Sequence, residues 1–326
     1  MRAHSHRRQR QRGVAVITAL LLTTLAVTIV ASLFWQQQVQ VRSMENQRLH
    51  LQTKWILRGA LDWARLVLRQ DGFDNQVATT LDGVWATPLA ETRLDQYIER
   101  ERVEGESFDA TLSGHIVDAQ SRYNLAALAG GGAVVPGQVE VYKHLLENLQ
   151  LDGALAQRTA EAMARTQPAN STLANPVVIV RPGAQPGDGE PLEFKQLDDL
   201  LAIPGYTAEI VAKLREFAIV LPEPKAVNVN TAPPEVLSAL VVGMSVSEAA
   251  ALVYKRKQAY FRDVGYFKGL LNNKSFPANV TVEFKSEYFL ATSKVRLDRA
   301  TLDAEALIHR QNGNGYPTTL VWIRQY

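Results

Sequence analysis

The chain of 326 residues contains no cysteine. This absence excludes disulfide bonds, thiol catalysis and metal sites built on thiolates. Proline is also missing from the beginning of the chain, where the first one is Pro88. A long helix can therefore form in this region without the break that an internal proline causes.

Charge is missing from residues 14–35. At about 1.5 Å per residue, a helix of this length measures about 33 Å, which is enough to cross the hydrocarbon core of a bilayer. The 13 residues before it contain no acid and five arginines, namely Arg2, Arg7, Arg8, Arg10 and Arg12. Under the positive-inside rule, this pattern predicts a single-pass protein with a cytoplasmic N-terminus and its remaining chain across the membrane.

Three interpretations of this segment compete. A cleaved secretory signal has a shorter apolar core of about 7–15 residues, and its best late site, after Ala31, would place the bulky Ile29 three residues upstream. A plain membrane anchor explains the length and the arginines, but it does not explain why Gly13 directly precedes the apolar run. Residues 12–21, with the sequence RGVAVITALL, resemble the third type, a prepilin signal.

The apolar run continues into a polar segment without a helix-breaking residue. Leu57, Leu61, Ala64 and Leu68 then follow at spacings of 4, 3 and 4, which places them on one helical face. We therefore predict one helix over residues 14–70, about 85 Å long, that ends at Asp71-Gly72. Its first half would lie in lipid or against neighbouring subunits, and its second half would pack on a globular domain.

The rest of the chain is large enough to bury a core. About 250 residues follow the predicted helix, and 46% of the whole chain is hydrophobic, which suggests two domains. The formal net charge is +2, and removal of the five leader arginines would leave about −3. A mature chain of this charge has no basic footprint for nucleic acid.

The periodicity of the sequence changes twice after the long helix. A strand is predicted at 107–117, where apolar residues alternate with more polar ones. A helical block with a Pro/Gly-rich loop at 175–191 follows, and the chain ends in three strands of an antiparallel meander. The predicted helices are 139–149, 153–166, 194–203, 207–217, 233–241 and 246–258, and the predicted final strands are 288–297, 300–310 and 318–324.

This order predicts an α+β fold shaped like the pilin lollipop, with a long N-terminal transmembrane helix, an antiparallel sheet and an inserted all-α domain. The expected divisions are a leader at 1–13, a long helix at 14–70 with its membrane span at 14–35, an α/β domain made of 71–122 and 277–326, and a helical domain at 123–276 with segments similar to helix-hairpin-helix units.

Four phrases carry a specific resemblance: the leader with its helix, Ser121-Arg122-Tyr123-Asn124-Leu125, the segment VNVNTAPPEVL at 227–237, and Tyr288-Phe289-Leu290. Together they resemble the K-type minor pseudopilins of the bacterial type II secretion system, the general secretion pathway protein K family. The family tends toward Phe-Asn-Leu-Asn where this chain has Tyr123-Asn124-Leu125-Ala126. In the third phrase, Thr231 is expected to cap a helix opened by Pro233 and Pro234.

The resemblance implies processing and assembly. A prepilin peptidase would cleave between Gly13 and Val14, and the new N-terminus would be methylated. Most pilins and pseudopilins have glutamate at the position of Thr18, where the carboxylate meets the N-terminal amine of a neighbouring subunit, but the K-type family lacks it. A subunit at the tip of the pseudopilus has no subunit above it and no such amine to neutralise. We also expect Thr18 to bond its own helix backbone.

The same resemblance implies partners and a location. The chain would initiate assembly with the I-type and J-type minor pseudopilins through its helix, where Ala15, Ala19 and Ala26 permit close approach. It would also meet the inner-membrane secretion platform and, in the assembled system, secreted proteins. Its place would be the bacterial inner membrane, with the globular part in the periplasm.

Two alternatives from other classes stay open. One is a minor pilin of a type IV pilus, which has the same fold and processing. The other is a membrane-anchored periplasmic DNA-binding protein, because residues 200–210 resemble half of a helix-hairpin-helix unit and residues 242–245 resemble the start of another. Each loop has one glycine, whereas close approach to a phosphate backbone usually needs two. We therefore expect no binding of nucleic acid.

The sequence also contains no strong catalytic or metal-binding pattern. Gly130-Gly131-Gly132 lacks the Lys-Ser/Thr pair of a phosphate loop, and the histidines occur singly, so we expect no enzymatic activity and no required cofactor. The resemblance to the family allows calcium. Oxygen ligands for it are available near the final strands, at Glu283, Glu287, Asp298 and Asp303.

Overall fold

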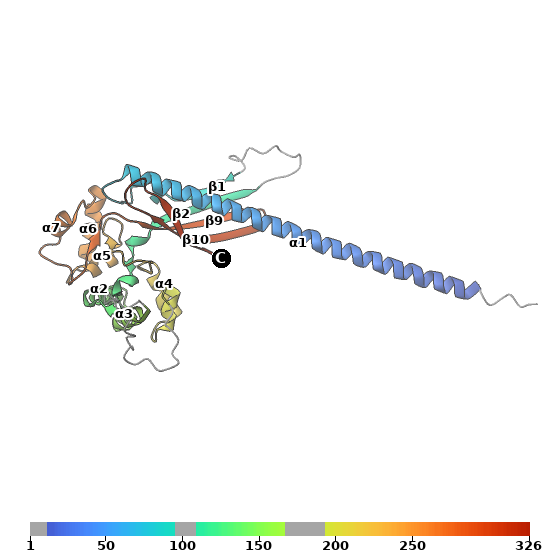
Figure 1. Ribbon diagram of the computed structural model, residues 1–326, viewed down its shortest axis with the longest axis horizontal. Coiled ribbons are helices and arrows are strands. Elements are labelled where there is room, and N and C mark those ends of the chain that lie inside the picture. Colours follow the sequence, from blue (N-terminus) through green and yellow to red (C-terminus); the bar gives the residue numbers. More distant parts are fainter. Residues whose placement is uncertain (1–11, 95–108, 167–192) are drawn as a thin grey trace, which may run out of the picture.

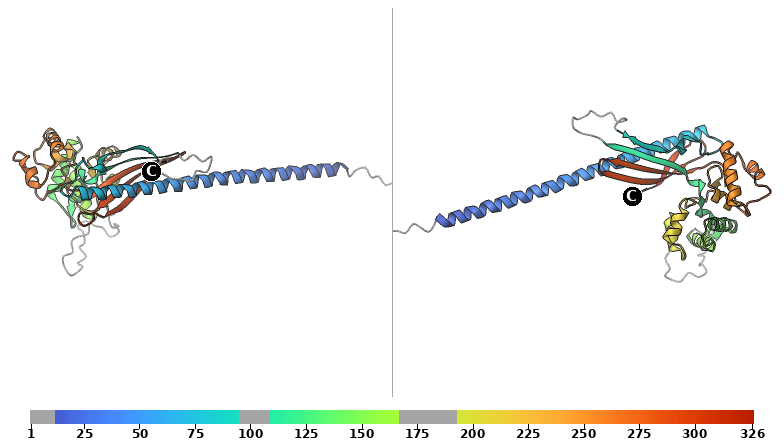
Figure 2. Two further views of the ribbon diagram at one scale, coloured as in Figure 1. Left: turned by 90° about the horizontal axis from the view of Figure 1, so that it is seen from above. Right: turned by 180° about the vertical axis from the view of Figure 1, so that it is seen from behind.

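The computed structural model describes residues 12–94, 109–166 and 193–326. Figure 1 shows one long helix, α1, whose C-terminal half lies along an antiparallel sheet, with a group of short helices at the far end. The two further views in Figure 2 show the same arrangement, in which the N-terminal half of α1 projects freely from the globular part. The predicted α+β lollipop is thus confirmed.

Helix α1 spans Arg12–Asp74, and at about 1.5 Å per residue its 63 residues extend about 95 Å. The expected end near residue 70 was wrong, because Gly72 lies inside the helix. A Cβ atom at Gly72 would lie 2.6 Å from the ring of Tyr316. The glycine therefore provides space for an aromatic side chain that packs on the helix and does not terminate it.

The sheet has five antiparallel strands in the order β1-β2-β9-β10-β11. The central strand β9 pairs with β2 on one side and β10 on the other, from Ala110 opposite Leu297 to His309 opposite Tyr288. The predicted meander is present at almost the same residues. The strand bounds are β1 Leu89–Arg93, β2 Ala110–Asp118, β9 Tyr288–Leu297, β10 Ala300–Arg310 and β11 Thr318–Gln325.

One face of the sheet is covered by α1. Leu57, Leu61, Ala64 and Leu68 are all buried, as their spacing predicted, and they share one core with side chains of β9 and β10 such as Phe289. The opposite face of the sheet packs on Ile219 and Leu221 of the helical part through side chains of β9 and β10 such as Leu290.

The helical part has its own hydrophobic core, which extends from Tyr123 to Phe284. Its helices are α2 Pro136–Asn148, α3 Leu155–Thr166, α4 Ala208–Leu214, α5 Pro234–Leu240, α6 Val246–Gln258 and α7 Val264–Gly269. Three pairs of short strands lie outside the main sheet: β3 Tyr123–Asn124 with β6 Ala218–Ile219, β4 Ala129–Gly130 with β5 Ala133–Val134, and β7 Val227–Asn228 with β8 Val282–Glu283. The 3-10 turns are η1 Val84–Ala86, η3 Ala119–Ser121, η4 Leu125–Leu128 and η5 Leu197–Ala202.

Several expected boundaries differ from the structure. The strand predicted at 107–117 is β2, which lies three residues later at its start, and the helix predicted at 194–203 is the 3-10 segment η5. Strand β1 and helix α7 had no clear pattern and were missed. The helical core also includes Val280, Val282 and Phe284, beyond the boundary expected at residue 276. The predicted loop at 175–191 lies outside the described residues.

Candidate interaction site and the junction behind it

The free part of α1 is an apolar rod without protein cover. Val14, Leu20 and Phe34 are 63%, 60% and 68% exposed, and the other large apolar side chains of residues 14–35 are similarly open. In the described part of the chain, α1 is the one helix long and apolar enough to cross a membrane, with a peak mean hydropathy of 2.5. A helix that is apolar on every face is suited to contact with lipid or with other apolar helices.

The threonines of this rod do not interrupt its apolar character. The Thr18 hydroxyl donates to the carbonyl oxygens of Val14 and Ala15, at 3.1 and 3.0 Å. Its predicted bond to its own backbone is thereby confirmed. The hydroxyls of the other three threonines in the rod also donate to carbonyls three or four residues earlier, so each of these donors is satisfied within the helix.

The sequence-predicted site residues lie together at the free end of the rod. Gly13 and Val14 belong to the first turn of α1, at the end opposite the sheet, and Thr18 follows one turn later. Ala15, Ala19 and Ala26 are separated by 4 and 7 residues, so they lie on one face of the helix. The structure therefore places these residues together at the exposed end of α1, away from the globular part.

The exposed apolar surface continues beyond the predicted membrane span. Leu51, Trp55 and Leu66 lie on the side of α1 that faces away from the sheet, and they are 59%, 70% and 62% exposed. Large apolar side chains that remain open next to a packed core mark contact surfaces more often than a scattered single residue does. This surface was not predicted, because the spacing analysis considered only the face of the helix that packs on the sheet.

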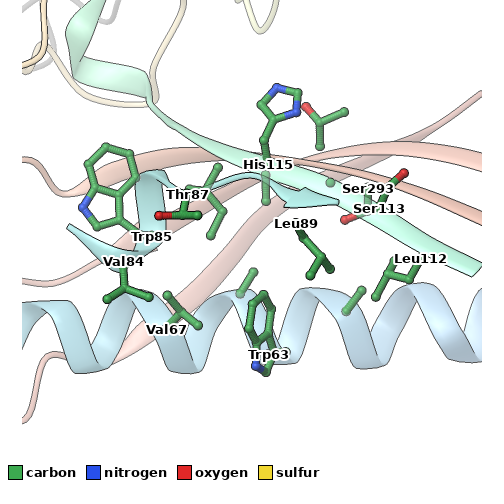
Figure 3. A pocket seen from close by; sticks show the side chains of 16 residues that line it. Trp63, Val67, Val84, Trp85, Thr87, Leu89, Leu112, Ser113, His115 and Ser293 are labelled. Carbon is green, nitrogen blue, oxygen red and sulfur yellow. The ribbon is translucent and has the colours of Figure 1, made fainter. Parts of the chain in front are cut away.

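A pocket opens between α1 and the β1-β2 edge of the sheet (Figure 3). Trp63 and Val67 line it from the helix, and Leu89 and Leu112 line it from the strands. Trp63 is half exposed, and Val84 at the same edge is 75% exposed. The pocket is mainly apolar and contains no set of catalytic groups, so it extends the apolar surface of the rod to the edge of the sheet.

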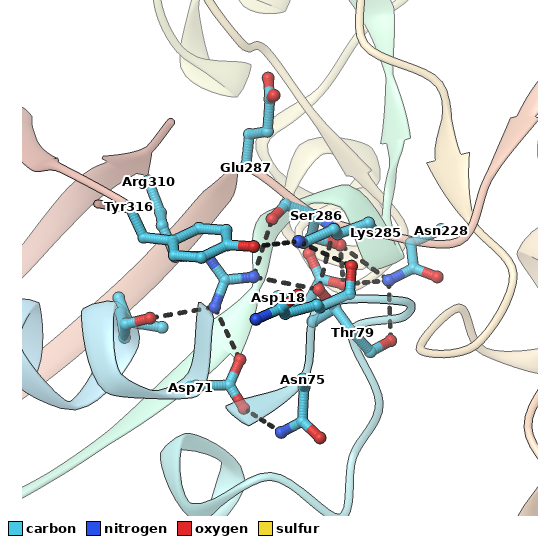
Figure 4. Close-up of polar contacts among 12 residues, drawn as sticks. Asp71, Asn75, Thr79, Asp118, Asn228, Lys285, Ser286, Glu287, Arg310 and Tyr316 are labelled. Atoms are coloured by element: carbon cyan, nitrogen blue, oxygen red, sulfur yellow. Dashed lines mark hydrogen bonds and ion pairs between the residues drawn. The ribbon is translucent and has the colours of Figure 1, made fainter. Parts of the chain in front are cut away.

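A buried ion pair joins the end of α1 to the end of β10. The Arg310 guanidinium donates to the Asp71 carboxylate at 2.6 Å and to the Leu68 carbonyl at 3.0 Å. Its second terminal nitrogen donates to the Thr79 hydroxyl and the Ser286 carbonyl, each at 3.1 Å (Figure 4). The arginine is completely buried and therefore connects the helix, the following linker and the sheet.

A buried carboxylate, Asp118 at the end of β2, continues this network toward the helical part. It accepts hydrogen bonds from the hydroxyls of Ser286 and Thr231 at 2.5 and 2.6 Å, from the Asn228 side-chain amide at 3.1 Å and from the Gln120 backbone at 2.8 Å. Burial raises the pKa of Asp118 from its ordinary value of 3.8, and these bonds partly offset the effect.

We call Thr79, Asp118, Asn228, Ser286 and Arg310 the junction. These residues come from five separate places in the chain and form one connected set of hydrogen bonds. The junction therefore fixes the angle between α1 and the helical part. The packing of α1 on one face of the sheet would not determine this angle alone.

The Asn-Val-Asn-Thr phrase at 228–231 connects the junction to the end of the helical part. Asn228 belongs to the junction and donates to Asp118, whereas Asn230 bonds both backbone groups of Phe261, at 2.8 and 2.9 Å. The buried Arg256 of α6 donates to the carbonyls of Val229 and Ala232, at 2.9 and 2.6 Å. We call residues 228–231 the connector phrase, because they join the junction to Phe261 and to α6.

The expected role of Thr231 was wrong. The residue before α5 is Pro233, and no side chain caps this helix. The Thr231 hydroxyl donates instead to Asp118, 113 positions earlier in the chain. Sequence spacing could not reveal this, because the Thr231 hydroxyl donates to a carboxylate far away in the chain and does not accept from a nearby backbone N–H of α5.

The four candidate calcium carboxylates do not come together. Glu283 accepts from Gln120 at 2.7 Å, Glu287 pairs with Lys225 at 2.6 Å, and Asp303 lies 3.7 Å from Lys294. Asp298 occupies the β9-β10 turn with a positive φ of 49°. Across the residues that the structure describes, no group of three or more His, Asp or Glu side chains is placed to hold a metal ion. These residues therefore do not fit a calcium site.

The segments that resemble DNA-binding hairpins have ordinary structural roles. Thr207 caps α4 by accepting from the Ile210 backbone, and Ser245 forms a capping box with Glu248 at the start of α6. Gly205 and Gly243 have positive φ angles of 105° and 68°, as turns before helices require. Both loops are thus explained by helix capping.

Asp118 and Arg310 are the important residues that sequence analysis missed. Asp118 directly follows the strand predicted at 107–117, and Arg310 is the last residue of the strand predicted at 300–310. A charged residue that follows an apolar strand is usually solvated, so neither position carried a local signal of burial. Their partners lie far away in the chain, and only the fold brings them together.

Comparison with known proteins supports the resemblance. Two family models described as type II secretion system protein K match residues 121–223 and 227–283. The first match begins at Ser121 and the second at Val227, which open two of the phrases that carried the resemblance. The matched segments include most of the helical part and the connector phrase.

Full-length relatives show the same similarity. Type II secretion system protein K from Pseudomonas aeruginosa is 28% identical over 321 residues, which cover 94% of this chain and 91% of that protein. The protein of the same name from Klebsiella pneumoniae is 26% identical, with 93% of each chain covered.

A solved structure shares the fold. It is the crystal structure of the GspK-GspI-GspJ complex from the type 2 secretion system of enterotoxigenic Escherichia coli, and one of its chains matches with a TM-score of 0.60 and 17% identity. The match covers 87% of this chain and 99% of the other. Taken with the apolar rod, the sheet and the connector phrase, these similarities identify the chain as a member of the type II secretion system protein K family, the K-type minor pseudopilins.

Proposed function

We propose that this minor pseudopilin occupies the tip of the pseudopilus and initiates its assembly with the I-type and J-type minor pseudopilins. The main support is the combination of an exposed apolar rod, an uncharged Thr18 and a bulky helical part at the opposite end. The solved relative comes from a GspK-GspI-GspJ complex. We infer from this similarity that the chain assembles with the same two kinds of subunit.

In this proposal, a prepilin peptidase cleaves between Gly13 and Val14, and the new N-terminus is methylated. The rod crosses the inner membrane with the arginines on the cytoplasmic side and the globular part in the periplasm. Assembly would proceed on the inner-membrane platform. The protein itself would catalyse no reaction, and its contribution would be shape and contact.

The proposed helix contact can be tested by single-cysteine cross-linking, because the chain contains no cysteine that would give a background. Ala19→Cys lies on the face with Ala15 and Ala26. Leu21→Cys is the matched control, because at 3.6 residues per turn it projects from the opposite face. Partner strains would carry one cysteine at the equivalent depth of the I-type helix.

Ala19→Cys is expected to form a disulfide-linked heterodimer with the I-type subunit in membranes, and Leu21→Cys much less of it. Intact mass and N-terminal sequencing of the same extracted protein should give an N-methylated chain that begins at Val14. Equal cross-linking from both faces would contradict the specific contact. A chain that retains Met1, in cells with an active prepilin peptidase, would contradict the proposed processing.

A further inference from the structure

Helices α6 and α7 lie at the end of the helical part that is opposite the free end of α1 (Figure 1), and the exposed residues there are basic and rich in tyrosine. We call residues 254–268 the apex; they include the end of α6 and most of α7. Four of its cations are exposed, and its one acid is Asp263. The exposed cations are Lys255, Lys257, Arg262 and Lys268.

These four cations have no counter-charge within the part of the chain that the structure describes, where no ion pair involves them. The Asp263 carboxylate is used as a helix cap and accepts from the Tyr266 backbone at 2.9 Å. Glu248, at the other end of α6, is bound by Lys274 at 2.6 Å. The apex is therefore positive, although the mature chain as a whole would be negative.

Large amphipathic side chains lie between the cations. Tyr254 is 66% exposed, Tyr260 is 41% exposed and Tyr266 is 46% exposed, and Val264 beside them is 46% exposed. Tyrosine combines a large contact area with a hydroxyl that can bond, and it is enriched in the centres of protein interfaces. Three exposed tyrosines within 13 positions therefore indicate a contact surface more than an ordinary solvated helix end.

Buried hydrogen bonds and aromatic packing fix the backbone of the apex. Asn230 bonds both backbone groups of Phe261, and Arg256 anchors α6 to the connector phrase. Phe261 and Phe267 pack with their ring centres 4.9 Å apart beneath the surface. A surface fixed in this way loses little conformational entropy when a partner binds, so its exposed groups can contribute more of their contact energy to affinity.

We propose that the apex docks an acidic surface patch of a protein that the system exports. Its charge favours an acidic partner, and its separated tyrosines favour a protein surface over a uniform polyanion such as DNA, which the net negative mature chain would repel. The inference rests on the proposed function in one respect: a subunit at the tip leaves the apex uncovered and facing outward.

Site-specific photo-cross-linking tests this contact in the full chain. The photoreactive residue p-benzoylphenylalanine replaces Tyr266 in cells with an active secretion system. The matched control carries it at Tyr326, which is 74% exposed and lies next to the end of β11, far from the apex. Tyr266 is expected to give an adduct with an exported protein that mass spectrometry identifies, attached at a surface rich in Asp and Glu. Tyr326 is expected to give none.

Charge reversal gives the second measurement. Lys255→Glu, Lys257→Glu and Arg262→Glu together are expected to reduce the adduct about tenfold, which corresponds to about 1.4 kcal/mol. The detergent-extracted full chain should bind the identified protein more weakly as salt rises, because the contact is electrostatic. The corresponding Lys→Arg variant keeps the charge at positions 255 and 257 and should retain the adduct.

Several results would overturn the proposal: an equal adduct from Tyr326, no effect of charge reversal, or an adduct only with another pseudopilin, a channel component or a second copy of this chain. Tight binding of a duplex DNA probe at physiological salt would also overturn it. The Ala19→Cys cross-link, measured in a chain whose apex charges are unchanged, separates the two hypotheses. If that cross-link forms while p-benzoylphenylalanine at position 266 gives no adduct with an exported protein, the apex proposal fails and the proposed function stands.

Discussion

The guanidinium of Arg310 lies 2.6 Å from the carboxylate of Asp71, and both side chains are almost completely buried. One residue ends the strand β10, and the other lies in the last turn of the 63-residue helix α1. Removal of either partner would leave a buried charge without its counter-charge. The pair therefore fixes where the rod leaves the globular part.

Replacement of one member should destabilise the protein strongly. We expect Arg310→Met to lower the free energy of unfolding by about 3–5 kcal/mol, because Asp71 then stays buried and unpaired. The double variant Asp71→Leu with Arg310→Met should recover part of this loss. Urea unfolding of the extracted chain measures both. A single variant as stable as the parent would show that the pair contributes little.

Asp118 should be sensitive both to substitution and to pH. Asp118→Asn would turn an amide toward hydroxyl and amide donors, and we expect a loss of about 1–3 kcal/mol in the free energy of unfolding. Because burial raises the pKa of Asp118 above 3.8, the folded state binds a proton more readily than the unfolded state. The stability due to this protonation is present at low pH and decreases as pH rises through the raised pKa.

The free energy of unfolding, measured from pH 4 upward, checks this sign. The difference between the parent and Asp118→Asn should be greater at pH 4 than at pH 8. Thr231→Val is a useful comparison, since it removes one donor to Asp118 and leaves the carboxylate in place. An Asp118→Asn difference that grows with pH would contradict the raised pKa.

The connector phrase should control order at the apex. Asn230→Ala removes both hydrogen bonds to the Phe261 backbone, so the buried amide and carbonyl lose their partners at a cost of about 1–3 kcal/mol. Hydrogen exchange should increase in residues 259–267 more than in the sheet. Gln258→Ala, at an exposed helix end, is the control and should leave exchange unchanged.

Sequence patterns predicted the parts of this fold that depend on local periodicity. The buried face from Leu57 to Leu68 and the meander of β9 to β11 follow directly from spacings of about 3.6 and 2. The residues that orient these elements were not predicted. Arg310, Asp118 and Thr231 act through partners far away in the chain, and Gly72 leaves room for the ring of Tyr316, 244 positions later.

The site residues selected from the sequence stay predictions, and they form only part of the candidate site. Gly13, Val14 and Thr18 could be selected because a leader, a cleavage glycine and an apolar run are adjacent in the sequence. Trp55, Leu66 and the apex could not, because exposure is a property of the folded chain. A tryptophan in a helix is expected to be largely buried, and only the structure shows that the side of α1 with Trp55 packs on no other element in the described part of the chain.

The cap of α6 should respond to acid. The carboxylate of Glu248 accepts from Lys274 and from the Ser245 backbone and hydroxyl, and these bonds lower its pKa to about 2. The stability from these bonds is therefore present above pH 4.5 and is lost as pH falls toward 2. Lys274→Ala should raise the pKa toward its ordinary value of 4.5, measured by NMR titration of the glutamate carboxyl carbons. An unchanged pKa would show that Lys274 is not the main cause.

Thr18 offers the most direct test of the proposed position at the tip. Within the described residues, its hydroxyl bonds only to carbonyls of its own helix, so Thr18→Val should assemble and secrete as the parent does. Thr18→Glu would place a carboxylate in the apolar rod, where an unpaired charge costs about 2.5–3.5 kcal/mol at the centre of a membrane span. With no subunit above it to provide an amine, this variant should incorporate poorly, as measured by the Ala19→Cys cross-link and by secretion. If Thr18→Glu works as well as Thr18→Val, a cation reaches this position in the assembly, and the chain is then an internal subunit of the filament.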